Sequence, residues 1–238
     1  MNLEKIFRHF CDSLHDRKEL MTEDNVRYYW FASMLKEDPE LEHYTMEYPY
    51  EPSVFADIPR RTKKELDFLY LNEGESYCME IKFHRNPDPN STYAHTDAAG
   101  CLFSDIIRLS LFKPGKSYKL QQKECILPAQ TRRFFLYVTD AEMHNYLGYS
   151  GQYNSNQDYR TVLKEFYAMP IDGQYRTLSY RQVPRTFEEC ALDALDRDKY
   201  NLYSIPPIRL LFADAFSSMQ SESFKGHQCH VRLYEING

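Results

Sequence analysis

Apolar residues near the start of the chain recur at the spacing of a helix. Between Asn2 and Leu14 they fall at i, i+3, i+4 and i+7 from Leu3, so one face of this segment is apolar. A second helix is predicted from Thr22 to about Lys36. Thr22 can cap its first turn, and the acidic Glu23 that follows suits the positive end of a helix dipole.

The pattern then changes to alternation, which is typical of strands. Residues 44–50 alternate, with Tyr44, Met46 and Tyr48 expected on one face. Two further strands are predicted at residues 65–71 and 76–83. A short turn containing Gly74 separates these two strands, which predicts an antiparallel hairpin.

Helical spacing returns after the hairpin, from about Asp97 to Phe112. The continuous apolar run from Phe134 to Val138 favours a strand that is buried on both faces. Residues 208–212 and 229–236 predict two more strands, and residues 86–96 and 148–158 predict loops. Together these elements predict an α/β (α+β) fold, with a central mixed sheet flanked by helices in a single domain over residues 1–238.

Composition excludes several classes of protein. The 238 residues are 42% hydrophobic and 27% charged, as in an ordinary globular chain. No segment approaches the roughly 20 apolar residues that span a bilayer, and the first residues lack a signal-peptide pattern. We therefore expect a cytoplasmic protein with no membrane partner. The net charge of -6 argues against a protein that coats DNA non-specifically, but a local basic groove and metal ions could offset it in an enzyme.

The candidate chemistry lies on the predicted hairpin. Alternation places Glu80 and Lys82 on one face of the second strand, and Asp67 on the less apolar face of the first. If these faces coincide, two carboxylates and an amine converge. A divalent cation relieves the repulsion between two such carboxylates, and Mg²⁺ commonly uses one or two of them together with waters and phosphate oxygens. The cluster therefore suits hydrolysis of a phosphodiester, with Lys82 orienting water and stabilising negative charge.

These residues resemble the signature of the PD-(D/E)XK nuclease superfamily, whose fold is that of restriction endonucleases. The motif reads Glu65-Leu66-Asp67 followed by Glu80-Ile81-Lys82, with Leu66 in place of the proline, and the resemblance covers about residues 22–140. It implies a nuclease dependent on Mg²⁺ or Mn²⁺, with Asp67 and Glu80 as metal ligands and Lys82 as a catalytic residue. Glu23 resembles the helix acid that often joins such sites.

The resemblance also implies a nucleic-acid substrate, with DNA expected, in restriction, phage defence or repair. Cutting both strands would favour a homodimer. The predicted backbone contacts are the basic residues around the motif: Arg60, Arg61, Lys63, Lys64, Arg85 and Arg108.

Other interpretations stay open for the same residues. Glu80 and Lys82 could form a surface ladder on an exposed hairpin, and Asp105 with Arg108 could be a simple helix ion pair. Glu23 could serve only the helix dipole, and a lone His84 is more often structural. At the level of function, the rivals are an RNA-directed nuclease and an inactive nuclease fold that acts as a nucleic-acid or protein interaction module.

Overall fold

The structure is a computed structural model. It describes residues 1–15, 22–50, 64–85, 94–112, 114–115, 117–120, 123–148, 157–179, 183–192, 205–217 and 228–237. The helices are α1 (Leu3–His15), α2 (Glu23–Leu35), the 3-10 turn η1 (Leu41–His43), α3 (His95–Leu111), α4 (Ala141–Gly148), α5 (Gln157–Tyr167) and α6 (Arg185–Ala191). The strands are β1 (Tyr44–Tyr50), β2 (Lys64–Leu71), β3 (Ser76–His84), β4 (Ser117–Leu120), β5 (Lys123–Ile126), β6 (Arg132–Asp140), β7 (Ile208–Ser217) and β8 (Gln228–Ile236).

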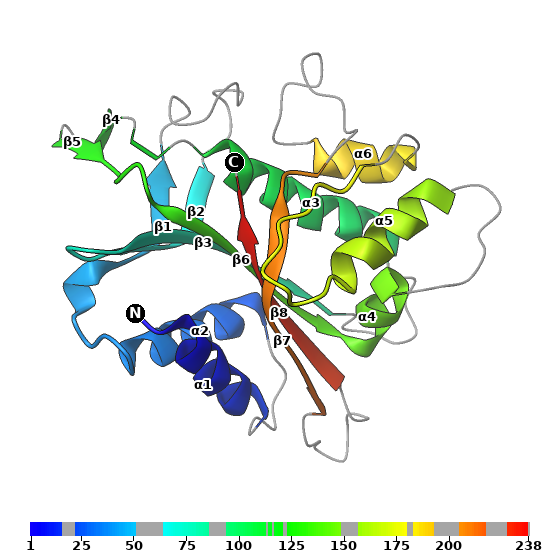
Figure 1. Ribbon diagram of the computed structural model, residues 1–238, viewed down its shortest axis with the longest axis horizontal. Coiled ribbons are helices and arrows are strands. Elements are labelled where there is room, and N and C mark those ends of the chain that lie inside the picture. Colours follow the sequence, from blue (N-terminus) through cyan, green and yellow to red (C-terminus); the bar gives the residue numbers. More distant parts are fainter. Residues whose placement is uncertain are drawn as a thin grey trace.

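Six strands form one mixed sheet in the order β1-β2-β3-β6-β8-β7 (Figure 1). β3 and β6 are parallel and are connected through α3, whereas the other neighbours are antiparallel. The α/β prediction is therefore confirmed, as is the antiparallel pairing of the hairpin. β4 and β5 form a separate two-stranded ribbon in a region for which no element was predicted.

Helices cover both faces of this sheet. α1 and α2 lie on one face, and α3, α4, α5 and α6 lie on the other (Figure 1). Phe68, Met79 and Ile81 point into the core under α1 and α2, together with Trp30 of α2. Leu69 and Cys78 point into the core under α3. By alternation, Glu80 and Lys82 share the α3 face with Cys78.

Both helices that approach the hairpin are fixed locally. Thr22 accepts a hydrogen bond from the Asn25 amide at 3.3 Å, and the Asn25 side chain returns one to the Thr22 amide at 3.2 Å. This capping box confirms the predicted helix start and makes Glu23 its first residue. On the other face, a Cβ at Gly100 of α3 would lie 2.6 Å from the Phe187 carbonyl oxygen, so only glycine allows α6 to pack this closely.

β1 and β2 change face in the middle, which alternation alone did not predict. Met46 pairs with Phe68 on the α1–α2 side, but Tyr48 and its partner Leu66 belong to the core under α3. Glu47, between them, has a φ of 49°, in the left-handed region that non-glycine residues rarely adopt. The expected common face of Tyr44, Met46 and Tyr48 is therefore wrong at Tyr48. In this register Asp67 lies opposite Glu47, so the candidate carboxylate lies where the strand switches faces.

Candidate active site

The candidate site lies where β2 and β3 separate. Their ladder runs from Leu71 opposite Ser76 to Phe68 opposite Met79. Beyond it, the Ile81 amide donates to Asp67 Oδ2 at 2.6 Å, and the Phe83 amide donates to Glu23 Oε2 at 3.2 Å. Two carboxylates therefore take the positions that carbonyl groups of a neighbouring strand would occupy, and they satisfy amides that burial would otherwise leave unpaired.

Each strand carboxylate is paired with an arginine from a helix. Arg27 Nη2 of α2 lies 2.7 Å from Asp67 Oδ1, and Arg108 Nη2 of α3 lies 2.9 Å from Glu80 Oε1. Asp67 is 7% exposed and Glu80 only 3% exposed. The helices on the two faces thus reach the same opening in the sheet, and each places an arginine beside one buried acid.

Lys82 is held by two further acids, again one from each helix. Its Nζ lies 3.4 Å from Asp105 Oδ2 and 3.9 Å from Glu23 Oε2. These acids also pair with the arginines of their own helices, since Glu23 lies 3.1 Å from Arg27 and Asp105 lies 2.9 Å from Arg108. The result is a continuous charged cluster, which we define as Glu23, Arg27, Asp67, Glu80, Lys82, Asp105 and Arg108.

The charged cluster holds more acids than bases, and its protonation reflects this. Burial raises the pKa of Glu80 to about 8, because the opposing charge of Arg108 is offset by Asp67 and Asp105. Burial also raises the pKa of Asp67 to about 6, against the lowering effects of Arg27 and the Ile81 amide. Two carboxyl groups whose pKa values approach neutrality mark a site that would gain from an added cation.

Lys82 responds in the opposite sense. Burial by itself lowers the pKa of an amine, but the carboxylates of Asp105 and Glu23 outweigh it, so the pKa of Lys82 is raised. Lys82 therefore stays protonated at neutral pH. It is a fixed positive charge and a hydrogen-bond donor, and it cannot act as a general base.

Solvent reaches the charged cluster from one side. The side chain of Glu80 is 4% exposed, whereas Lys82 is 24% and Glu23 is 32% exposed. Solvent therefore reaches Lys82 and Glu23, whereas Glu80 is almost fully covered. The burial of Glu80 contradicts the alternative of a surface Glu-Lys ladder, in which both side chains would be hydrated.

The oxygen donors suit a hard divalent cation that keeps part of its water shell. Among the described residues, no group of three or more His, Cys, Asp or Glu residues is arranged to enclose a metal ion. Mg²⁺ does not require such a cage, because it commonly binds through one or two carboxylates. Glu80 Oε1 is buried, with Arg108 Nη2 beside it at 2.9 Å. The Asp67 and Glu80 carboxyl groups are electrostatic neighbours, so they are the residues that would provide oxygen ligands for such an ion.

The remaining predicted residues do not all join the charged cluster. Arg60, Arg61 and Lys63 lie outside the described residues, as does the side chain of Lys64. Arg85 follows β3, and its neighbours are the Asp140 carboxyl group and the Cys229 thiol, on the sheet face opposite Glu80. Arg108 does join the cluster, and its pair with Asp105 confirms the predicted helix ion pair.

His84 has a structural contact. It is 7% exposed, and its Nδ1 lies 3.1 Å from the Tyr137 hydroxyl. Burial, assisted by Lys82, lowers the pKa of His84 to about 3, so this ring is neutral. A neutral, buried imidazole offers no charge to a phosphate.

Arg27 is the residue of the site that sequence reasoning missed. Its local signals are the i, i+4 spacing from Glu23 and the i, i+3 spacing from Asp24, which are common on exposed helices. The pairing with Asp67 depends on how α2 lies across the strands. Asp105 was recognised as a partner of Arg108, but its contact with Lys82 could not be read from spacing along the chain.

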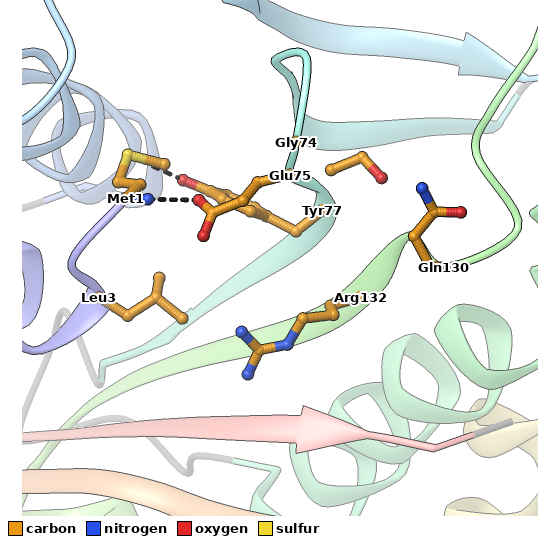
Figure 2. A pocket seen from close by; sticks show the side chains of 8 residues that line it. Met1, Leu3, Gly74, Glu75, Tyr77, Gln130 and Arg132 are labelled. Atoms are coloured by element: carbon orange, nitrogen blue, oxygen red, sulfur yellow. Dashed lines mark hydrogen bonds and ion pairs between the residues drawn. The ribbon is translucent and has the colours of Figure 1, made fainter.

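A separate cavity of about 250 Å³ lies near the N-terminus, where Glu75, Tyr77 and Arg132 are among the lining residues (Figure 2). Its charged groups already have protein partners: the Met1 amino group pairs with Glu75, and Arg132 pairs with Glu235. The cavity therefore lacks the uncompensated acids that distinguish the charged cluster.

Comparison with known protein families, with curated proteins and with solved structures finds no match. Within the described part of the chain, no helix is both long and apolar enough to cross a membrane.

Proposed function

We propose that this protein is a metal-dependent nuclease that hydrolyses phosphodiester bonds of nucleic acid. The observation that supports the proposal is the charged cluster, in which Asp67 and Glu80 are electrostatic neighbours with raised pKa values and Lys82 is joined to them through Asp105 and Glu23. The resemblance of the motif to PD-(D/E)XK nucleases supports the same reaction. DNA is the expected substrate, and Mg²⁺ or Mn²⁺ the expected cofactor.

The roles follow from the contacts. Asp67 and Glu80 hold the ion, which when bound lowers the pKa of a coordinated water and neutralises charge that develops on the phosphate. Lys82 faces the solvent-accessible side, where its ammonium orients the attacking water and donates to the phosphate oxygens. Asp105 and Glu23 are positioning residues, because they fix the amine and keep it protonated.

The decisive experiment combines metal binding with cleavage. Mn²⁺ should bind the wild type in calorimetry, and Mg²⁺ or Mn²⁺ should support cleavage of plasmid DNA. Lys82→Ala should lose cleavage and keep Mn²⁺ binding, whereas Glu80→Gln should lose both. Arg8→Gln, which changes an exposed ion pair on α1, is the matched control and should behave as the wild type.

The inactive-module rival rests on the same ion pairs, since arginines alone could neutralise Asp67 and Glu80. It predicts that Mn²⁺ does not bind and that no nucleic acid is cut. Absence of metal binding in the wild type would therefore favour the module. Cleavage of RNA but not DNA would keep the mechanism and change the substrate.

A further inference from the structure

The two arginines of the charged cluster have equivalent positions. Each bridges a buried strand carboxylate and an acid of its own helix. Arg27 lies 2.7 Å from Asp67 and 3.1 Å from Glu23. Arg108 lies 2.9 Å from both Glu80 and Asp105. A metal ion bound by the strand carboxylates would therefore compete with one contact of each arginine. The contact with the acid of the same helix would remain.

A divalent cation and a guanidinium repel each other when they bind the same buried carboxylate. Asp67 and Glu80 are almost fully buried, so their charges are poorly screened by water. An ion that binds both carboxylates therefore competes with the arginines for them. Glu23 and Asp105 would still hold the bases of Arg27 and Arg108 close to the solvent-accessible side of the cluster.

The displaced guanidinium groups have an obvious ligand if the substrate is a phosphodiester. A guanidinium binds phosphate through paired N–H donors, as it binds carboxylate. Arg27 has an unused hydrogen-bond donor, because its buried Nε makes no hydrogen bond among the described residues. Without metal, by contrast, Asp67 and Glu80 occupy the two guanidinium groups, so a phosphate would have to compete with them.

We propose that Arg27 and Arg108 are phosphate-binding residues that Asp67 and Glu80 sequester until metal binds. This inference rests on the proposed nuclease function and adds a regulatory order to it. Metal releases the arginines, and the arginines then bind the backbone of the nucleic acid. Metal binding and nucleic-acid binding are therefore positively coupled, and the coupling passes through these two side chains.

The first test measures the salt dependence of DNA binding, with Ca²⁺ as a metal chosen to suppress cleavage. Each phosphate neutralised adds about 0.9 to the log-log salt slope for duplex DNA. Ca²⁺ should therefore steepen the wild-type slope by about 1.8, the value for two added contacts. In Arg27→Gln/Arg108→Gln the steepening should disappear, whereas Arg8→Gln should retain it.

The second test releases the arginines without metal. Asp67→Asn/Glu80→Gln should bind DNA in EDTA with the steeper slope that the wild type shows only with Ca²⁺. At pH 9, where the Asp67 and Glu80 carboxyls of the wild type are mostly ionised, adding Arg27→Gln and Arg108→Gln to this variant restores the wild-type net charge, and this fourfold variant should lose the gain. Because charge is matched at that pH, a persisting gain would contradict the role of the arginines. Circular dichroism and thermal unfolding identify variants that do not fold.

Mn²⁺ calorimetry separates failure of this inference from failure of the proposed function. Arg27→Gln should bind Mn²⁺ about tenfold more tightly than the wild type at pH 8, because a competing cation is removed. Unchanged affinity, with metal binding intact, would overturn the sequestration while leaving the nuclease proposal in place. No metal binding in any variant would overturn both.

Discussion

Two buried glutamates in this molecule have nearly the same exposure, but their pKa values are shifted in opposite directions. The side chain of Glu80 is 4% exposed and that of Glu235, on β8, is 7% exposed. Glu235 accepts hydrogen bonds from Arg132 at 2.8 Å and Arg209 at 2.5 Å. Burial alone would raise the pKa of Glu235, but these two arginines hold it below its usual value.

Glu80 has one arginine and two neighbouring acids, and its pKa is raised to about 8. The difference shows that burial and pairing with arginine do not by themselves separate a structural ion pair from a candidate site. What separates them is the local balance of charge. The negative charge of Glu235 is more than balanced by its two arginines, whereas the single arginine beside Glu80 does not balance the acids around it. Only the second arrangement would be stabilised by an added cation.

The largest effects are expected from removing one basic residue of the charged cluster and, for comparison, one that pairs with Glu235. Lys82→Ala should reduce cleavage by at least about 10³-fold, because a fixed positive charge near the phosphate is lost. The variant also leaves Asp105 and Glu23 without their shared amine, so its unfolding free energy should fall as well. Arg209→Ala should leave cleavage unchanged and lower stability by about 1–3 kcal/mol, because Glu235 loses a charged partner. Cleavage assays and urea unfolding measure both; equal cleavage losses would erase the distinction.

The next largest difference is expected in the stability cost of replacing each glutamate with glutamine. Glu235→Gln should cost about 2 kcal/mol, since a buried carboxylate with two hydrogen-bonded arginines is lost. Glu80→Gln should stay within about 1 kcal/mol of the wild type at pH 7, because the Glu80 carboxyl is already largely protonated there. Chemical denaturation at pH 7 provides the comparison. A larger cost at Glu80 than at Glu235 would contradict the inferred charge balance.

The pH dependence should also have opposite signs. Glu80 has a folded-state pKa of about 8, above its unfolded value of 4.5, so its protonated form stabilises the fold. That stability is present below pH 4.5 and is lost as pH rises towards 8, with a slope of at most about 1.4 kcal/mol per pH unit. Glu235, with a lowered pKa, stabilises the fold above pH 4.5 and loses this effect as pH falls.

These slopes are best measured as differences between wild type and variant, because other groups titrate in the same range. Burial lowers the pKa of His230 to about 4, for example, and this opposes the effect of Glu80. The wild-type minus Glu80→Gln difference should decline between pH 5 and pH 8 and rise again when Mn²⁺ is added. A flat difference would mean that Glu80 remains ionised without metal.

The smallest effect is expected at Arg85. This residue lies near Asp140 and Cys229, on the sheet face away from the charged cluster. Arg85→Gln should therefore change cleavage by no more than about twofold, in contrast to Arg108→Gln, and should leave the salt slope within about 0.3 of the wild type. A large loss in Arg85→Gln would place the nucleic acid across the end of the sheet instead.

Local sequence signals determined the individual elements and the motif. The spacing of apolar residues predicted α1, α2 and α3, and alternation around a glycine turn predicted the β2–β3 hairpin. Alternation also placed Glu80 and Lys82 on one strand face. These features depend on residues close together in the chain, where the periods of helix and strand decide which side chains are neighbours.

Only the tertiary structure decided which charges meet. Arg27 lies 40 residues before Asp67 along the chain, and their contact requires α2 to cross the opening of the sheet. The face change at Glu47 and the separation of β2 from β3 bring Asp67 within reach of helices on both faces. Neither the α5 helix nor the β4–β5 ribbon was predicted. Coulomb energies depend on distance and burial, not on separation along the sequence, so the raised pKa values of Asp67 and Glu80 follow only once the sheet and both helices have packed.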